Sequence, residues 1–323
     1  KEGIGNIDIE KKINSVCPYC GVGCQIEYNV KDNIIKYVNG IDGPANKNRL
    51  CVKGRFGFDY VSSPERLTKP LIRIKGKKKD LHPNIDFSNL YDYFREATWD
   101  EALDFAANGF IEIKKKRNGK SNLAGFGSAK CSNEEAYLFQ KLIRTGFNTN
   151  NVDHCTRLCH ASSVAALLET IGSGAVTAPF YEVQHSEVII VIGANPTENH
   201  PVAATFFKNA AKKGSKLIVM DPRGHALKKH ATHMLQFKPG SDVALLNSIM
   251  NVIVEENLFN EDYIKKQTSG FDELQKHLKN YPPELMEEQT GIDANMIKEV
   301  ARLFAKTKKG IIFWGMGVSQ HVH

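Results

Sequence analysis

The segment VIIVIGANPTENHP, residues 188–201, joins an uninterrupted apolar run to a turn rich in glycine, asparagine and proline. A helix-like stretch then extends to Lys213 and stops at Gly214, and a second apolar run over residues 216–220 ends at Asp221. Two apolar runs of strand length with a helix between them predict a parallel βαβ crossover. Strands without polar alternation are typical of a parallel sheet that is covered on both faces. This stretch therefore predicts an α/β fold.

The alternation of strands and helices extends in both directions from this unit. Upstream, capping signals at Thr98 and Ser132 predict two helix starts, and a short strand is expected at residues 123–126. Downstream, a helix capped by Ser241, a helix near residues 296–305 and a strand at residues 311–314 are expected. We therefore expect a doubly wound, mainly parallel α/β architecture for the lower two-thirds of the chain.

The N-terminal part of the chain follows a different pattern. Residues 25–30 and 34–38 alternate around a turn at residues 31–33, which predicts a β-hairpin. Residues 40–60 are rich in glycine and aromatic side chains and show no periodicity. A module of about 65 residues with so small a core needs an additional stabilising group to fold. We expect the cysteines to bind that group.

The bulk composition excludes several classes of protein. Among the 323 residues, 41% are hydrophobic, but no run approaches the roughly 18 apolar residues of a membrane helix. The net charge of +7 comes from dispersed basic residues without interleaved aromatic ones, which argues against a nucleic-acid groove and suits an anionic cofactor. Seven cysteines, an odd number, do not suggest a secreted disulfide framework. A reducing compartment, the cytoplasm, is therefore expected.

Four of the cysteines have the spacing of a metal centre. Three follow a C-x2-C-x3-C pattern, and 26 residues separate the third from a distant fourth; they are Cys17, Cys20, Cys24 and Cys51. Paired zinc knuckles and c-type haem attachment have other spacings. The pattern favours a [4Fe-4S] cluster over zinc or over free buried thiols.

A second thiol site lies at Cys159. It directly precedes His160 and a predicted helix over residues 161–171, and a helix N-terminus favours the thiolate form. Three roles are open for it from the residues alone, namely a buried structural thiol, a nucleophile or a soft metal ligand. Cys155 and Cys131 are interpreted as packing or structural residues.

The turn after the first apolar run is a candidate ligand site. Residues 193–201 follow a strand and precede a helix, where α/β sheets bind ligands, although no G-x-G-x-x-G motif is present. Asp221 and Arg223 follow the next strand. Nucleotide binding and a plain scaffold turn are both compatible with this position.

Together these stretches resemble a known family, the molybdenum or tungsten bis-pyranopterin guanine dinucleotide oxidoreductases. The resemblance is strongest to the catalytic α subunits of soluble, cysteine-type, NAD-dependent formate dehydrogenases. The stretches that carry it are residues 17–24, 50–55, 151–160, 192–201, 220–223 and 313–320.

The resemblance implies roles for individual residues. Cys17, Cys20, Cys24 and Cys51 would hold the [4Fe-4S] cluster, with Lys53 between the cluster and the pterin. Cys159 would be the protein ligand to Mo or W, and His160 the neighbouring proton acceptor. The positions that resemble dinucleotide-binding ones are Ser128, Lys130, Gly193, Asn195, Glu198, Asn199, His200, Asp221, Arg223, Gly240, Asp242, Met316 and Gln320.

The resemblance also implies a reaction and an organisation. Formate would be oxidised to CO2, with electrons passing through the cluster to FMN- and Fe-S-containing NADH-oxidising partner subunits. The expected domains are a cluster module at residues 1–65, the first part of a discontinuous α/β domain at residues 66–152, and a Rossmann-like dinucleotide domain at residues 153–323. Members of the family are longer, so we expect an internal fragment that is inactive by itself.

Three other functions are compatible with parts of the pattern. Nitrate reductase belongs to the same superfamily, and a non-catalytic Fe-S subunit of a respiratory complex shares the fold without binding molybdenum. A zinc-dependent nucleic-acid binder would account only for the cysteines and the basic charge.

Overall fold

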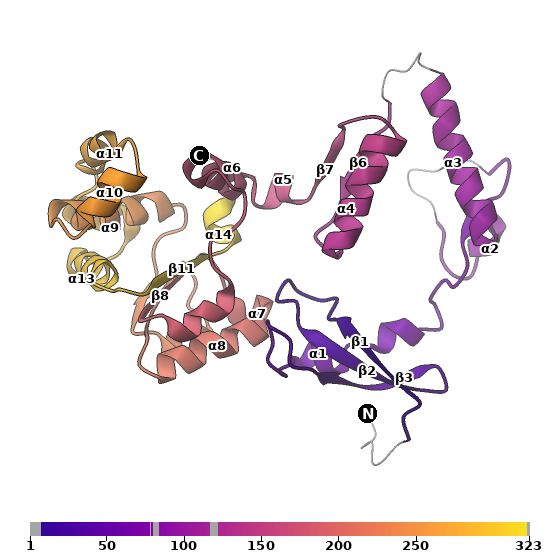
Figure 1. Ribbon diagram of the computed structural model, residues 1–323, viewed down its shortest axis with the longest axis horizontal. Coiled ribbons are helices and arrows are strands. Elements are labelled where there is room, and N and C mark those ends of the chain that lie inside the picture. Colours follow the sequence, from indigo (N-terminus) through magenta and orange to yellow (C-terminus); the bar gives the residue numbers. More distant parts are fainter. Residues whose placement is uncertain (1–7, 78, 80–83, 117–121, 322–323) are drawn as a thin grey trace. The chain divides into compact units, whose positions relative to one another are not determined.

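The computed structural model describes residues 8–77, 79, 84–116 and 122–321 (Figure 1). The chain divides into two compact units. The first comprises residues up to Ile13 together with Tyr28–Val38 and Val52–Arg157. The second comprises Asn14–Glu27, Asn39–Cys51 and the chain from Leu158 onward.

A four-stranded parallel sheet forms the centre of the second unit. Its strands lie in the order β10-β9-β8-β11, with β8 at Val188–Ile192, β9 at Lys216–Met220, β10 at His233–Leu235 and β11 at Gly310–Trp314. Helix α8, Pro201–Lys212, connects β8 to β9, and all three strand pairs are parallel. The structure therefore confirms the predicted crossover and the mainly parallel sheet.

Helices cover both faces of this sheet. Because side chains alternate along a strand, Ile190 and Ile218 face α9 (Asp242–Glu255) and α13 (Ala294–Ala305), whereas Ile189 and Leu217 face α8. All five residues of β8 are buried, which explains its purely apolar sequence. Doubly wound packing thus follows from the apolar strands.

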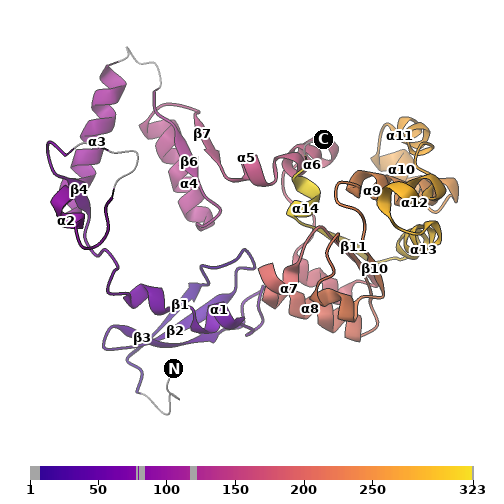
Figure 2. The same ribbon diagram turned by 180° about the vertical axis from the view of Figure 1, so that it is seen from behind.

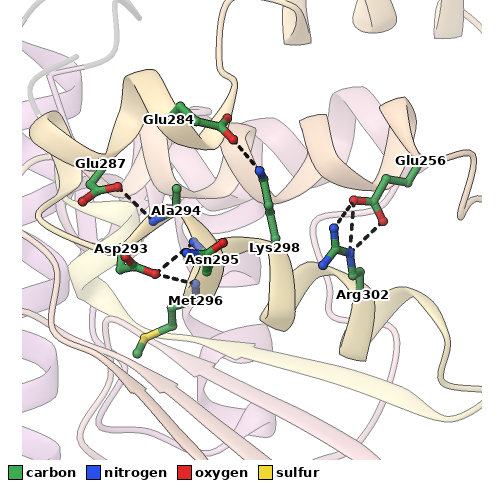
Figure 3. A network of polar contacts seen from close by, with 9 residues as sticks. All are labelled: Glu256, Glu284, Glu287, Asp293, Ala294, Asn295, Met296, Lys298 and Arg302. Carbon is green, nitrogen blue, oxygen red and sulfur yellow. Dashed lines mark hydrogen bonds and ion pairs between the residues drawn. The ribbon is translucent and has the colours of Figure 1, made fainter.

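Polar contacts join α13 to its neighbours (Figure 3). The Asp293 carboxylate caps the helix by accepting hydrogen bonds from the backbone N–H groups of Asn295 and Met296. Arg302 binds Glu256 through two nitrogens, at 2.8 and 2.6 Å. Two further contacts, Lys298 with Glu284 and the Ala294 N–H with Glu287, join α13 to α12, Pro283–Thr290. Exposed ion pairs contribute little, so the buried apolar face of α13 supplies most of its stability.

Other helices of the second unit complete the frame around the sheet. Ser241 precedes α9 as predicted, but its side chain does not cap the helix, because its hydroxyl donates to the carbonyl of Lys238 at 2.7 Å instead. The remaining elements are α5 (Thr156–Cys159), α6 (Ala161–Ile171), η3 (Phe180–His185), α7 (Pro196–Asn199), η4 (Ala226–His230), α10 (Glu261–Gln267), α11 (Phe271–Leu278) and α14 (Met316–Ser319).

The N-terminal strands form a separate sheet in the order β1-β2-β3. Strand β1 is Lys11–Val16, β2 is Gln25–Lys31 and β3 is Ile34–Gly40. The turn residues Asp32 and Asn33 both have positive φ, 53° and 57°, as a two-residue hairpin turn requires. The predicted hairpin is confirmed.

The first unit contains two small sheets and several helices. Strand β4 (Leu71–Arg73) pairs antiparallel with β5 (Phe94–Glu96), and β6 (Gly125–Gly127) pairs parallel with β7 (Val152–His154). Both predicted helix starts are confirmed, with Thr98 capping α3 and a complete capping box at Ser132 of α4. The helical segments are α1 (Val52–Phe56), η1 (Asp59–Ser62), α2 (Leu90–Tyr93), α3 (Trp99–Lys115), α4 (Asn133–Lys141) and η2 (Leu142–Gly146). In the described part of the chain, no helix is both long and apolar enough to cross a membrane.

Two isoleucines that lie opposite each other in the sheet test this packing. Ile190 in β8 is paired with Ile312 in β11, but their exposed fractions are 3% and 43%. We expect Ile190→Ala to lower the free energy of unfolding by about 3 kcal/mol, because it leaves a cavity under the helices. Ile312→Ala should cost about 1 kcal/mol or less, since less apolar surface is lost from the core. Urea unfolding of both variants measures the difference, and equal losses would contradict the two-layer packing.

Candidate functional site

The four N-terminal cysteines all belong to the second unit. Cys17, Cys20 and Cys24 lie on the loop between β1 and β2, which closes through a 2.8 Å hydrogen bond from the Cys17 N–H to the Cys24 carbonyl. Cys51 directly precedes α1. Val22 and Cys24 are buried in the same apolar cluster as α8, so the loop packs on one face of the parallel sheet.

The four thiols lie near one another and are chemically suited to a cluster. Burial first, and then the neighbouring thiols of Cys17, Cys20 and Cys51, raise the pKa of the Cys24 thiol to about 12. A bound iron-sulfur cluster would offset this penalty, because these cysteines would bind it as thiolates. Among the described residues, no three His, Cys, Asp or Glu side chains converge on one metal-ion position. Four thiols that lie near one another suit a [4Fe-4S] cluster, in which each iron takes one thiolate ligand.

Asn46 joins the two segments that carry these cysteines. Its side chain is fully buried, and its Oδ1 accepts a hydrogen bond from the Gln25 N–H at 3.1 Å. Its Nδ2 donates to the carbonyls of Gln25, Ile41 and Arg49, at 3.0, 3.2 and 3.1 Å. The sequence analysis did not identify Asn46, because one asparagine in an aperiodic loop carries no local signal.

A cation–π contact attaches the same loop to helix α8. The Arg49 guanidinium lies 4.7 Å from the centre of the Phe206 ring, which is buried in α8. Arg49 is two residues before Cys51, so this contact helps to hold the fourth cysteine beside the sheet.

Three predicted positions lie in the first unit. Lys53 is in α1, and Ser128 and Lys130 follow β6. The Ser128 hydroxyl accepts a hydrogen bond from the Lys130 N–H at 3.1 Å, and Ser128 helps to line a cavity of about 900 Å³. The placement of Lys53 between cluster and pterin stays a prediction.

One of the two other cysteines differs from expectation. Cys131 and Cys155 are both exposed, so the prediction that Cys155 packs in the interior is wrong. Cys131 instead has a local role, because its thiol donates to the Ser128 carbonyl at 3.0 Å and stabilises the turn before α4.

Glycines bring the crossover loop of the second unit against the end of β11. A side chain on Gly193, whose φ is +57°, would place its Cβ 2.8 Å from the Val318 nitrogen. A Cβ on Gly315 or Gly317 would in turn meet the backbone of Gly193 at 2.6 to 2.8 Å. The Gly317 N–H donates to the Gly193 carbonyl at 3.0 Å. We call this close approach of the two backbones the glycine junction. It lies at the carboxyl ends of β8 and β11, where α/β folds bind ligands.

Two buried carboxylates follow the next strands. Asp221, at the end of β9, is 6% exposed and accepts a hydrogen bond from the Arg223 N–H at 2.8 Å. Asp242, at the start of α9, is 4% exposed and lies 3.3 Å from Nε2 of His321. Burial, and to a smaller extent Asp221, raises the pKa of Asp242. Neighbouring carboxylates can accept hydrogen bonds from the N–H groups of a guanine base.

The other predicted dinucleotide positions lie around the same carboxyl ends. Asn195 is buried and accepts a hydrogen bond from the Thr197 hydroxyl, and Gly240 has a φ of +85°. Glu198 and Asn199 are exposed in α7, and His200 links α7 to α8.

Cys159 and His160 lie beside the segment that follows β11. Cys159 ends α5 and His160 is the N-cap of α6, which covers the predicted residues 161–171. The Cys159 thiol lies 3.3 Å from the sulfur of Met316, and Nδ1 of His160 lies 3.0 Å from the Ser319 hydroxyl. Gln320 reaches the Leu158 carbonyl at 3.5 Å. The structure therefore brings Cys159, His160, Met316 and Gln320 together, whereas their roles as ligands stay predictions.

Comparison with known proteins is consistent with this geometry. Residues 10–63 match the molybdopterin oxidoreductase Fe4S4 domain, and residues 66–323 match the molybdopterin oxidoreductase model. The chain belongs to the molybdopterin oxidoreductase family. Membership confirms the predicted cofactor classes, a [4Fe-4S] cluster and a molybdopterin with Mo or W.

Individual members of the molybdopterin oxidoreductase family are similar over almost the whole chain. The α subunit of F420-dependent formate dehydrogenase from Methanocaldococcus jannaschii is 36% identical over 314 residues, which are 97% of this chain and 43% of that protein. Formate dehydrogenase H from Escherichia coli is 37% identical over 315 residues, 96% of this chain and 42% of the relative. The chain thus spans less than half the length of these relatives.

A solved structure supports the fold. Acetylene hydratase from Pelobacter acetylenicus superposes with a TM-score of 0.80 at 24% identity, over 96% of this chain and 41% of that one. The predicted α/β fold class, with an N-terminal Fe4S4 module, is confirmed.

The hydrogen bonds of Asn46 predict a role in cluster retention. We expect Asn46→Ala to cost about 3 kcal/mol, because it leaves several buried backbone groups without partners. Loosening the loop before Cys51 should also lower the iron content of the purified protein, measured beside its visible absorbance. Asn48→Gly is the matched control, since Asn48 is exposed and glycine accepts its positive φ of 63°. Full iron content in Asn46→Ala would contradict this role.

The glycine junction predicts a difference between two alanine variants. Gly193 and Gly172 both have positive φ, +57° and +72°, but a Cβ on Gly172 would meet no atom within 4 Å. Gly172→Ala should therefore cost only about 1 kcal/mol of backbone strain. Gly193→Ala should cost about 3 kcal/mol or more and reduce pterin content, because it forces two backbones apart. Thermal unfolding and pterin release measure both effects, and similar results for the two variants would refute the close approach.

Proposed function

We propose that this chain is part of the catalytic α subunit of a formate dehydrogenase, which oxidises formate to CO2. The observation that carries the proposal is that the consecutive residues Cys159 and His160 both contact the segment after β11, the thiol at Met316 and the imidazole at Ser319. Relatives named as formate dehydrogenases at 36 to 37% identity support formate over nitrate as the substrate.

Each predicted site residue would have its own role in such a site. Cys17, Cys20, Cys24 and Cys51 would hold the [4Fe-4S] cluster, and Cys159 would be the protein ligand to Mo or W. The metal supplies the two-electron redox chemistry when it is bound. His160 directly follows Cys159 in the sequence and would bind or exchange protons with the substrate. Lys53 would place a fixed positive charge on the electron path.

The dinucleotide positions would orient the pterin. Asp221 and Asp242 offer buried carboxylates to N–H donors of the guanine, and the glycine junction lets the pyranopterin approach the backbone. The same proposal includes a bis-guanine-dinucleotide cofactor, which Ser128 and Lys130 would also contact. It also includes the division into domains at residues 65 and 152.

The electron acceptor is part of the proposal as well. FMN- and Fe-S-containing NADH-oxidising subunits in the cytoplasm agree with the resemblance in the sequence. One relative is named for F420 instead, so acceptor choice varies among similar proteins. Reduction of NAD by the complete protein, measured with and without co-purified subunits, decides between NAD and F420 as the electron acceptor.

Substitution of the predicted metal ligand tests the function. In the full-length protein, Cys159→Ser should lower formate-dependent dye reduction by at least about a hundredfold, since a soft sulfur ligand is lost. The EPR signal of the reduced [4Fe-4S] cluster should persist, because Cys159 is not one of its four thiols. Cys155→Ser is the matched control and should retain activity, as Cys155 is exposed. Unchanged formate oxidation, or unaltered Mo or W coordination, in Cys159→Ser would refute the proposal.

A further inference from the structure

Two predicted site residues directly precede helix α6, which has no buried residue of its own. His160 is the N-cap of α6, and Cys159 is the last residue of α5, which likewise has no buried residue. Burial of apolar side chains fixes other elements of the second unit, such as β8, whose five residues are all buried. The position of Cys159 and His160 therefore depends more strongly on polar contacts.

Two consecutive serines in the first turn of α6 supply such contacts. The Ser162 hydroxyl donates a hydrogen bond to the Ser319 carbonyl at 2.6 Å. The Ser163 hydroxyl lies 2.6 Å from the Ser319 hydroxyl and accepts a hydrogen bond from the Trp314 indole N–H at 3.0 Å. Helices α6 and α14 pack against each other, as both views show (Figures 1 and 2). We call Ser162, Ser163 and Ser319 the serine cluster.

The hydroxyl groups of this cluster act between two elements and not within one helix. A hydroxyl in a helix commonly donates to the carbonyl four residues earlier. Thr170 of α6 does so, because its hydroxyl donates to the Ala166 carbonyl at 2.7 Å. Ser162 and Ser163 of the same helix instead direct their hydroxyls to residues more than 150 positions further along the chain.

The other side of the serine cluster has a fixed position. Ser319 is 7% exposed and ends α14, which begins directly after the glycine junction. The Gly317 N–H holds this segment on the Gly193 carbonyl at 3.0 Å, and the Ser319 hydroxyl lies 3.4 Å from the Gly315 carbonyl. The serine cluster therefore connects the start of α6 to the backbone at the carboxyl ends of β8 and β11.

The two predicted site residues meet the same short segment. The Cys159 thiol lies 3.3 Å from the Met316 sulfur, and Nδ1 of His160 lies 3.0 Å from the Ser319 hydroxyl. A hydroxyl can donate or accept, so the contact with His160 exists in either tautomer of the ring. Thiol and imidazole thus lie on one side of α14, and the serine cluster holds the helix that follows them.

We propose that the serine cluster positions Cys159 and His160 against the segment after β11. Its three members are positioning residues, because they act through the two groups that would meet the metal and the substrate. This inference rests on the proposed formate dehydrogenase function, in which Cys159 would be the metal ligand. Loss of the hydroxyls of Ser162 and Ser163 leaves the backbone hydrogen bonds of α6 in place but releases its start from α14.

EPR spectroscopy of the full-length enzyme tests the position of the thiol without turnover. The protein is reduced with dithionite to the Mo(V) or W(V) state. We expect Ser162→Ala/Ser163→Ala to keep the wild-type content of metal and pterin but to show a shifted or broadened metal signal, because the sulfur ligand moves. The signal of the [4Fe-4S] cluster should not change. An unchanged metal signal, or loss of the metal together with the pterin, would overturn the inference.

Kinetics with single variants of α6 test the effect on the reaction. Ser162→Ala should lower kcat for formate by at least about fivefold with a smaller change in KM, because the reacting groups are present but misplaced. Ser162→Thr keeps the hydroxyl and should stay within about twofold of the wild-type kcat. Thr170→Ala, the matched control, should also stay within about twofold, since its hydroxyl bonds only within α6. Equal losses in Ser162→Ala and Thr170→Ala, or no rescue by threonine, would show a merely structural role.

The two measurements separate this inference from the proposed function. The EPR result does not require formate, so a changed metal signal in Ser162→Ala/Ser163→Ala of a protein that fails to oxidise formate would refute the function and leave the positioning role intact. An unchanged metal signal and an unchanged kcat in an active formate dehydrogenase would overturn the positioning role and leave the function intact.

Discussion

The approach of the Gly193 backbone to Gly315 and Gly317 is the constraint on which the rest of the second unit depends. It exists because β8 and β11 pair in parallel with Ile192 opposite Trp314, so that both strands end at the same level. The chain leaving β11 must then pass directly over the crossover loop, and any side chain there would block it. Because Met316 and Ser319 follow at once, this register also determines where Cys159 and His160 find their partners.

The loop that carries Cys17, Cys20 and Cys24 packs against the same sheet, on the face that α8 covers. Its own hydrophobic residues are few, and Val22 and Cys24 are buried only because they join the core formed by α8, β8 and β9. Asn46 and the contact of Arg49 with Phe206 supply the polar and aromatic part of that attachment. The cluster cysteines and the Cys159 site are thus built on one rigid sheet within a single unit.

The sequence predicted what local patterns encode. Apolar runs identified β8, β9 and β11, and the capping signals at Thr98 and Ser132 identified two helix starts. Ser241 also preceded its helix, but a nearby carbonyl at Lys238 competes for its hydroxyl, which no local rule anticipates. Asn46, Ser163 and Ser319 were missed, because their partners come from distant parts of the chain and their own neighbours show no periodicity. The positions of the candidate ligands came from resemblance, whereas the hydrogen bonds that orient them became visible only in the structure.

Residues 315–320 carry two kinds of constraint that act at different ranges. The glycines at 315 and 317 set the backbone path, so a change there displaces Met316, Ser319 and Gln320 together. The Ser319 hydroxyl contacts Ser163, His160 and the Gly315 carbonyl, so its effect is confined to a few local hydrogen bonds. A short segment can therefore place a sulfur contact near Cys159 and a hydrogen bond at His160 while keeping the two separable.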